Sequence, residues 1–180
     1  MSEQQQASLR TRVVLSALYF LQYMALPVWF ITLVPYAKSM GAQGSMLAWM
    51  VSAMAIGTLA SPFVGMVTDR FFAAQKVMAF LNVVSAVGLV CAGLQTKPLP
   101  LLIILTVTMV FYMPTWSTIN YIIFSHCSPP VFLQIRVFGV IGWIAAAAFS
   151  VVGDWIGVKV NGTPLMFYCG AATVLVAAPQ

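Results

Sequence analysis

Six long apolar segments, separated by short polar breaks, constrain the fold of this chain more than any other feature. They extend over about Val13–Tyr36, Ser45–Thr68, Lys76–Gln95, Leu99–Phe124, Gln134–Trp155 and Pro164–Ala178. About 20 apolar residues in an α-helix cross the hydrocarbon of a bilayer; most segments reach that length, and the last is barely long enough. No segment alternates with a period of two, as the strands of membrane barrels do. The sequence therefore predicts an all-α integral membrane protein with six transmembrane helices.

The composition identifies the lipid bilayer as the solvent of this chain. Apolar residues make up 62% of the 180 residues and charged residues only 6%. Soluble domains carry about a quarter of charged residues, because they need a hydrated surface. The net charge of +5 comes from 8 Lys and Arg residues scattered between the apolar segments. Because these cations form no basic face, we expect no nucleic-acid partner.

The reactive side chains form no catalytic or metal-binding pattern. Cys91, Cys127 and Cys169 are odd in number and widely spaced, which argues against a disulfide framework or a metal site. Cys127 follows His126, but two adjacent ligands without two more do not make a metal site. We therefore expect no enzyme activity, no cofactor and no metal.

The cations in the polar breaks predict the orientation. Residues 1–12 form a polar tail, and residues 13–180 form the six-helix domain, which ends abruptly at Gln180. With the N-terminus inside, the cytoplasmic side holds Arg10, Arg12, Arg70, Lys76 and Arg136, and the outer side holds Lys38, Lys97 and Lys159. Positive charges favour the cytoplasmic side of a membrane protein, so we expect a cytoplasmic N-terminus.

The fifth segment carries an arginine and a tryptophan on one helical face. Arg136, Val140 and Trp143 are spaced by four and three residues, so a helix places them on the same side. Such a face offers a fork of hydrogen-bond donors and a flat aromatic surface for a ring. The alternative is that Arg136 is an anchor whose guanidinium reaches the lipid headgroups.

The first and fourth segments repeat this polar and aromatic character. Trp116 and Asn120 lie one helical turn apart in the fourth segment, and Gln22 and Trp29 share a stripe of the first. An amide inside a membrane needs a hydrogen-bond partner, so each is either a ligand contact or a packing contact between helices. The alternative for each tryptophan is ordinary use at the membrane interface or in packing.

Proline positions favour a lined cavity over simple packing. Transporters built from inverted three-helix repeats place their substrate site at interrupted helices in corresponding positions. Segments one and four correspond in such a scheme, and they contain the mid-segment prolines Pro27 and Pro114. Segments two and three offer only Pro62. We therefore expect interruptions in segments one and four.

The break between segments two and three contains Gly65, Asp69 and Arg70 in a G-x-x-x-D-R pattern. Gly65 permits close helix approach, while Asp69 and Arg70 can accept and donate charge-assisted hydrogen bonds across an interface. The alternative is an ordinary charged loop. The pattern resembles the gating-loop motif of the major facilitator superfamily, although Phe72 and Ala73 replace the glycine and base that follow in that family.

A more specific resemblance extends over the second half of the chain. The fourth segment reads Tyr112-Met113-Pro114-Thr115 with Asn120 shortly after, Pro129-Pro130 follows, and the fifth begins Arg136-Val137-Phe138-Gly139-Val140-Ile141-Gly142-Trp143. This arrangement resembles the bacterial nucleoside:proton symporter family. The first segment, with Phe20-Leu21-Gln22, Trp29 and Tyr36, also fits.

The resemblance implies a fold and a function. It implies two inverted three-helix repeats that form the N-terminal half of a major facilitator transporter, completed by a missing C-terminal half or a second copy. It further implies nucleoside uptake with protons across a bacterial inner membrane by alternating access. Arg136 and Trp143 would contact the nucleoside, with Val140 replacing a typical threonine. Further candidate contacts are Gln22, Trp29, Trp116 and Asn120; the gate would be Gly65, Asp69 and Arg70.

Two alternatives remain open at this point. One is a major facilitator transporter for another solute, such as a sugar or a drug. The other is a six-helix subunit or fragment with no transport of its own.

Overall fold

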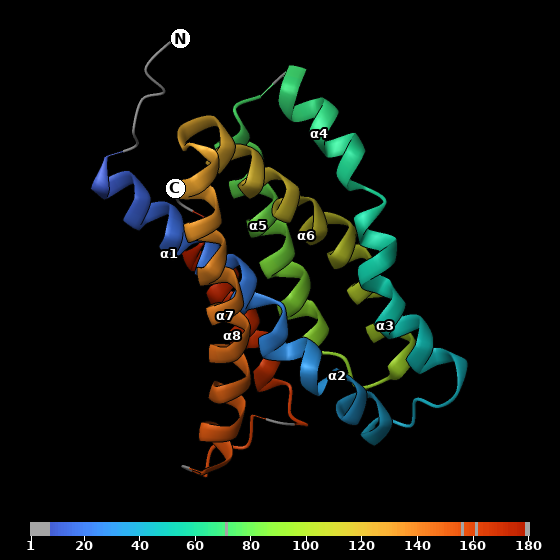
Figure 1. Ribbon diagram of the computed structural model, residues 1–180. Coiled ribbons are helices and arrows are strands. Elements are labelled where there is room, and N and C mark those ends of the chain that lie inside the picture. The colour runs from blue at the N-terminus through green and yellow to red at the C-terminus, as the bar shows by residue number, and fades with distance from the viewer. Residues whose placement is uncertain (1–7, 71, 156, 161, 179–180) are drawn as a thin grey trace.

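The computed structural model describes residues 8–70, 72–155, 157–160 and 162–178, where the chain forms eight α-helices (Figure 1). The side chains of Asp69 and Asp154 lie outside this description. The helices are α1 (Leu9–Ala25), α2 (Pro27–Ser39), α3 (Ser45–Thr58), α4 (Ser61–Arg70), α5 (Ala74–Gly93), α6 (Pro98–His126), α7 (Pro129–Trp155) and α8 (Leu165–Val176). The predicted all-α fold is confirmed.

The helices follow the six apolar segments. The first segment is divided into α1 and α2, and the second into α3 and α4. Leu9–Ser39, Ser45–Thr68, Ala74–Gly93, Pro98–His126 and Pro129–Gly153 are long and apolar enough to cross a membrane. The sixth segment forms α8, which has only 12 residues and is shorter than a full crossing requires. Phe167 of α8 is fully buried, so this short helix packs inside the bundle.

The first helix begins earlier than its apolar segment does. Residues 9–12, which the sequence assigned to the polar tail, form the first turn of α1. The Ser8 side chain explains this difference, because its hydroxyl oxygen accepts a hydrogen bond from the Thr11 amide at 3.2 Å. Such a cap satisfies one of the amides that a helix start leaves without a partner.

The helix breaks confirm the interruption expected at Pro27 and contradict the one expected at Pro114. The first span breaks at Leu26, between α1 and α2, and Pro27 begins α2. The fourth span does not break, because α6 is continuous from Pro98 to His126 with Pro114 inside it. The second interruption lies instead between α3 and α4, where Pro62 occupies the first turn of α4. Proline alone therefore does not locate the breaks.

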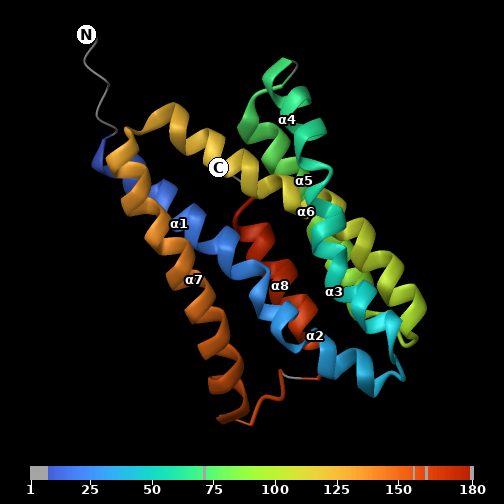
Figure 2. The same cartoon turned by 45° about the vertical axis from the view of Figure 1, so that its right-hand side comes forward.

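The packing follows the pattern of two inverted three-helix repeats. The second span of one repeat packs along the first span of the other: α3 lies beside α6, and α7 lies beside α1 (Figure 2). The third spans, α5 and α8, pack against each other. Each repeat thus covers the apolar face of the other, and the sixth span becomes part of this shared core.

Two glycines allow the closest contacts in this arrangement. Gly142 on α7 faces α1, where a Cβ atom at its position would lie 2.6 Å from the Phe20 carbonyl oxygen. Gly57 on α3 lies at the equivalent position against α6, where an added Cβ atom would collide with the Met109 backbone. Small residues at such points let membrane helices approach closely enough for backbone contact. The repeats therefore meet through a matched pair of glycines.

Candidate functional site

Three aromatic rings form a continuous stack between α1 and α6. The Tyr19 and Tyr23 rings lie 4.4 Å apart at an interplanar angle of 19°, and the Tyr23 and Trp116 rings lie 4.4 Å apart at 21°. Tyr23 was not among the sequence candidates, although its four-residue spacing from Tyr19 places both on one face of α1. The stack places Trp116 at its α6 end, beside Tyr23.

The indole N–H of Trp116 is buried and makes no hydrogen bond of normal geometry within the described part of the chain. The Tyr112 hydroxyl lies close enough to interact with Trp116. That hydroxyl donates its proton to the Gln22 carbonyl oxygen, and its oxygen keeps lone pairs that can accept from the Trp116 indole N–H.

Asn120 connects the stack to its own helix. Its side-chain nitrogen donates to the Trp116 carbonyl oxygen at 2.8 Å, and its side-chain oxygen accepts from the Tyr19 hydroxyl at 3.2 Å. Asn120 as a whole is half-buried. The residue thus meets both sequence interpretations, since it joins two helices and is partly exposed.

Helix α7 places the arginine face beside the aromatic stack. Gly139 lies over the Tyr19 and Tyr23 rings, where a side chain would collide with them. Arg136, one turn before Gly139, is exposed and lies within electrostatic range of the Tyr19 hydroxyl. Arg136 is therefore an accessible cation next to an aromatic surface.

The other two members of this face differ in exposure. Val140 is 61% exposed, while Trp143 is half-buried and packs against the core. An open apolar side chain therefore lies between the Arg136 guanidinium and the Trp143 ring system. This face can offer hydrogen-bond donors at one end and an aromatic surface at the other.

Gln22 lies in a different place, inside a fully buried polar cluster. Its side-chain nitrogen donates to Thr115 at 2.6 Å and to Asn82 at 3.3 Å, and its side-chain oxygen accepts from Asn82 at 3.2 Å. Asn82 also donates to the Ala177 carbonyl oxygen at 3.3 Å. This placement favours the packing interpretation of Gln22. The cluster joins α1, α5, α6 and the end of α8.

Trp29 likewise lies in the core and not on the arginine face. Its side chain is 2% exposed, and its ring lies 5.7 Å from Phe167 and 5.8 Å from Phe30. The Trp29 ring also fills the space that a side chain on Gly170 would need. These contacts favour a role for Trp29 in packing α2 against α8.

The candidate gate residues lie along α4. Arg70 ends the helix and is exposed, and nothing lies within 4 Å of a Cβ atom built on Gly65. Asp69 belongs to the same helix, but its side chain is outside the described part of the chain. Gly65 lines a recess between α4 and α6, and Arg70 is exposed at the end of α4.

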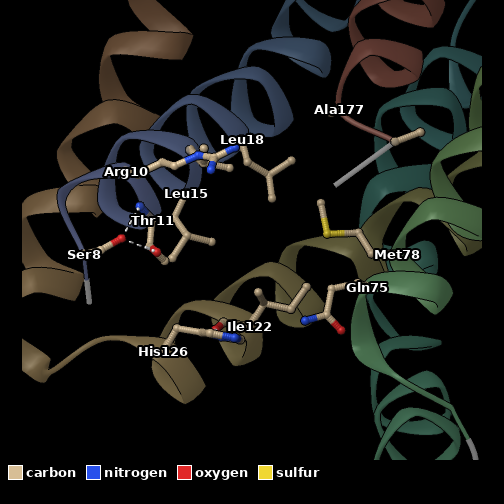
Figure 3. A pocket seen from close by; sticks show the side chains of 12 residues that line it. Ser8, Arg10, Thr11, Leu15, Leu18, Gln75, Met78, Ile122, His126 and Ala177 are labelled. Carbon is tan, nitrogen blue, oxygen red and sulfur yellow. Dashed lines mark hydrogen bonds between the residues drawn. The ribbon is translucent and has the colours of Figure 1, made fainter. Parts of the chain in front are cut away.

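A pocket of about 470 Å³ lies at the end of the bundle where α1 begins and α6 ends (Figure 3). Arg10, Gln75 and His126 surround it from three helices, and Leu18 and Met78 form part of its apolar wall. None of the candidate substrate residues lines this pocket. It is therefore separate from the face that carries Arg136. Among the described residues, His, Cys, Asp and Glu form no group of three able to hold a metal ion.

The buried amide cluster yields a prediction for stability. Replacing Asn82 with leucine should destabilise the protein by about 1–3 kcal/mol, because the Gln22 amide then loses its partner in a dry environment. Replacing both Gln22 and Asn82 with leucine should cost less than the sum of the two single changes. Unfolding in detergent of the parent, both single variants and the double variant measures this. Strictly additive losses would contradict coupling between the two amides.

Two inverted three-helix repeats, with an accessible cation beside an aromatic stack of α1 and α6, give this chain the fold of half a major facilitator transporter. The model of the nucleoside H+ symporter family matches residues 9–179. The chain belongs to this family.

Individual relatives agree with this assignment. The chain is 33% identical over 178 residues to YegT of Escherichia coli (strain K12), which is provisionally named a nucleoside transporter. It is 28% identical over 140 residues to the xanthosine permease of the same organism. These alignments cover 93% and 73% of the chain. They cover only 41% and 34% of the relatives, so the chain spans about two fifths of their length or less.

Solved structures show the same fold. A mutant of the nucleoside transporter NupG matches with a TM-score of 0.83 and 25% identity, over 93% of this chain and 42% of that one. A second structure of NupG matches with a TM-score of 0.80 and 24% identity over the same shares. The prediction of half a major facilitator fold is confirmed by these matches.

Proposed function

We propose that this protein takes part in nucleoside uptake across a bacterial inner membrane, coupled to protons and driven by alternating access. The observation that supports this most directly is the exposed Arg136 beside the tyrosine and tryptophan stack, in a chain of the nucleoside H+ symporter family. A nucleoside needs both an aromatic surface for its base and donors for its polar edges. The face on α7 offers both.

In this proposal, the nucleobase stacks on Trp143 and on the aromatic surface that ends at Trp116. Arg136 donates hydrogen bonds to the polar edge of the base or to the ribose hydroxyls. Asn120 offers a further contact, and Val140 packs against the ligand without a hydroxyl of its own. In this arrangement, Gln22 and Trp29 support the site indirectly, because they hold α1 and α2 in place.

The site is completed by a second six-helix unit. The chain spans about two fifths of its relatives, and Val140 at 61% and Ile144 at 64% exposure leave an apolar strip of α7 open. Because an arginine is costly against hydrocarbon, we expect the face that carries Arg136 to lie against another unit or a water-filled cavity and not against lipid. That unit is the rest of a longer chain or a second copy. Gly65, Asp69 and Arg70 would face it on the cytoplasmic side, with the N-terminus inside.

Uptake of labelled uridine and adenosine tests this proposal. Cells that lack their own nucleoside transport, expressing the protein, should accumulate both labels, and a protonophore should stop the accumulation. Replacing Trp143 with alanine should lower the affinity about 5- to 100-fold, since stacking on an aromatic ring contributes about 1–3 kcal/mol per base. Trp143→Phe keeps a ring and should retain most of the affinity.

The alternative solutes are distinguished in the same assay. A transporter of sugars or drugs would be inhibited by those solutes and not by unlabelled nucleosides. Competition by a sugar with no competition by uridine or adenosine would overturn the nucleoside proposal. Accumulation that persists with the protonophore would overturn proton coupling alone.

A further inference from the structure

A second recess lies on another side of the bundle, between α4, α5 and α6. This groove has a volume of about 570 Å³. Its walls are apolar, with Phe63 and Val67 from α4 and Val77 and Phe80 from α5, and among the described lining residues only Lys76 is ionisable. Phe63 is 67% and Phe80 is 61% exposed, so the groove opens outward.

The cation lies at one end of the groove. Helix α4 ends at Arg70 and α5 begins at Ala74, so both termini lie at the same end of the bundle (Figure 1). Lys76 is in the first turn of α5 and is exposed, while Phe80 lies about 6 Å further along that helix. The groove therefore extends from a positive charge at the membrane surface into the hydrocarbon.

The groove is distinct from the candidate substrate face. Helix α5 packs against α6 and α8, whereas α7 packs against α1 and α2. Figure 2 shows α7 at one edge of the molecule and α4 and α5 at the other. The groove lies on the α5 side of α4, whereas Gly65 lines a different recess, so a unit that covers Gly65 and the Arg136 face leaves the groove toward the surrounding lipid.

We propose that this groove binds one anionic phospholipid of the adjacent leaflet. The Lys76 ammonium group pairs with the headgroup phosphate, and an acyl chain lies along Phe63, Val67 and Phe80. Anionic headgroups attract lysine near the membrane surface, and a long lysine side chain reaches them from a helix end. An apolar recess within a bilayer is otherwise filled by lipid with no preference for charge, so the lysine gives the site its selectivity.

Native mass spectrometry tests the charge preference. The purified protein is incubated with equal amounts of dioleoyl phosphatidylglycerol and dioleoyl phosphatidylcholine, and the retained lipid is counted. Lys76→Gln should lower phosphatidylglycerol retention about fivefold and leave phosphatidylcholine unchanged. The matched control is Lys97→Gln, an exposed lysine at the start of α6 that does not line the groove, which should change neither. Equal retention of phosphatidylglycerol by the Lys76 variant and the parent would overturn the proposal.

A second pair of variants tests the groove itself. Val77→Trp fills the recess without a change in charge and should also reduce phosphatidylglycerol retention. A nitroxide label on Phe80→Cys, in proteoliposomes, reports what covers the groove. Collision with dissolved oxygen but not with a water-soluble nickel complex is expected for a lipid-facing position. Protection from both would show that protein occupies the groove, and the lipid site would be rejected.

Discussion

Nucleoside uptake by the Arg136→Ala variant is expected to fall about 10- to 100-fold relative to the parent protein at low substrate concentration. A hydrogen bond from a charged donor contributes more than one from a neutral donor, and the Arg136 guanidinium is exposed beside the aromatic stack. Initial rates of uridine and adenosine uptake over a range of concentrations measure the effect.

Two controls separate the role of Arg136 from that of a membrane anchor. Arg136→Lys keeps the charge but loses the planar fork, so it should recover only part of the affinity. Arg10→Ala removes an exposed arginine from α1 that lies apart from the candidate site, and its uptake should match the parent. If Arg136→Lys restores full uptake, charge alone suffices and the proposed bidentate contact is wrong. Unchanged uptake by Arg136→Ala would support the anchor interpretation.

Gly142→Ala is expected to destabilise the protein strongly for a single added methyl group. The added methyl would lie 2.6 Å from the Phe20 carbonyl oxygen, which belongs to the backbone of α1 and cannot rotate away. Helices α1 and α7 must then separate, which costs about 1–3 kcal/mol as in other overpacked cores. Thermal unfolding in detergent, followed by circular dichroism, measures the change.

Gly65→Ala is the matched control for this experiment. Nothing lies within 4 Å of a Cβ atom at Gly65, which is also inside a helix. Alanine has the higher helix propensity, so this variant should be unchanged or slightly more stable. Gly57→Ala should resemble Gly142→Ala, because the Met109 backbone blocks it in the same way. Equal stability of the Gly142 and Gly65 variants would show that the helices do not meet at that glycine.

The helical type and the approximate positions of the apolar segments could be predicted because a bilayer dictates them. Hydrocarbon thickness fixes the minimum length of a spanning helix, and polar breaks between apolar segments locate its ends. The breaks within spans were harder to predict. Pro114 stays inside a continuous helix, where the Pro114 carbonyl oxygen accepts hydrogen bonds from Ser117 and Thr118 side chains. Such local contacts depend on rotamers that sequence spacing does not reveal.

The candidate site could be predicted only in part, for a related reason. Helical spacing placed Arg136, Val140 and Trp143 on one face, and all three lie in the single helix α7. It could not show which face of α1 turns inward. Gln22 therefore entered the candidates although it is fully buried, and Tyr23 was omitted although its ring joins Tyr19 to Trp116. In a membrane helix, polar character marks both packing contacts and ligand contacts.

The hydroxyl of Tyr112 on α6 donates to the Gln22 carbonyl oxygen, four residues before the break in the first span. A helix break of this kind ordinarily serves as a joint, because its backbone groups are free to exchange partners. Here the Gln22 carbonyl oxygen is hydrogen-bonded to the opposite repeat. The Gln22 side chain is also hydrogen-bonded to Thr115, which lies on α6 like Tyr112. These two contacts tie the part of the first span before Leu26 to α6, so we expect α1 and α6 to move together as one body in the proposed transport cycle.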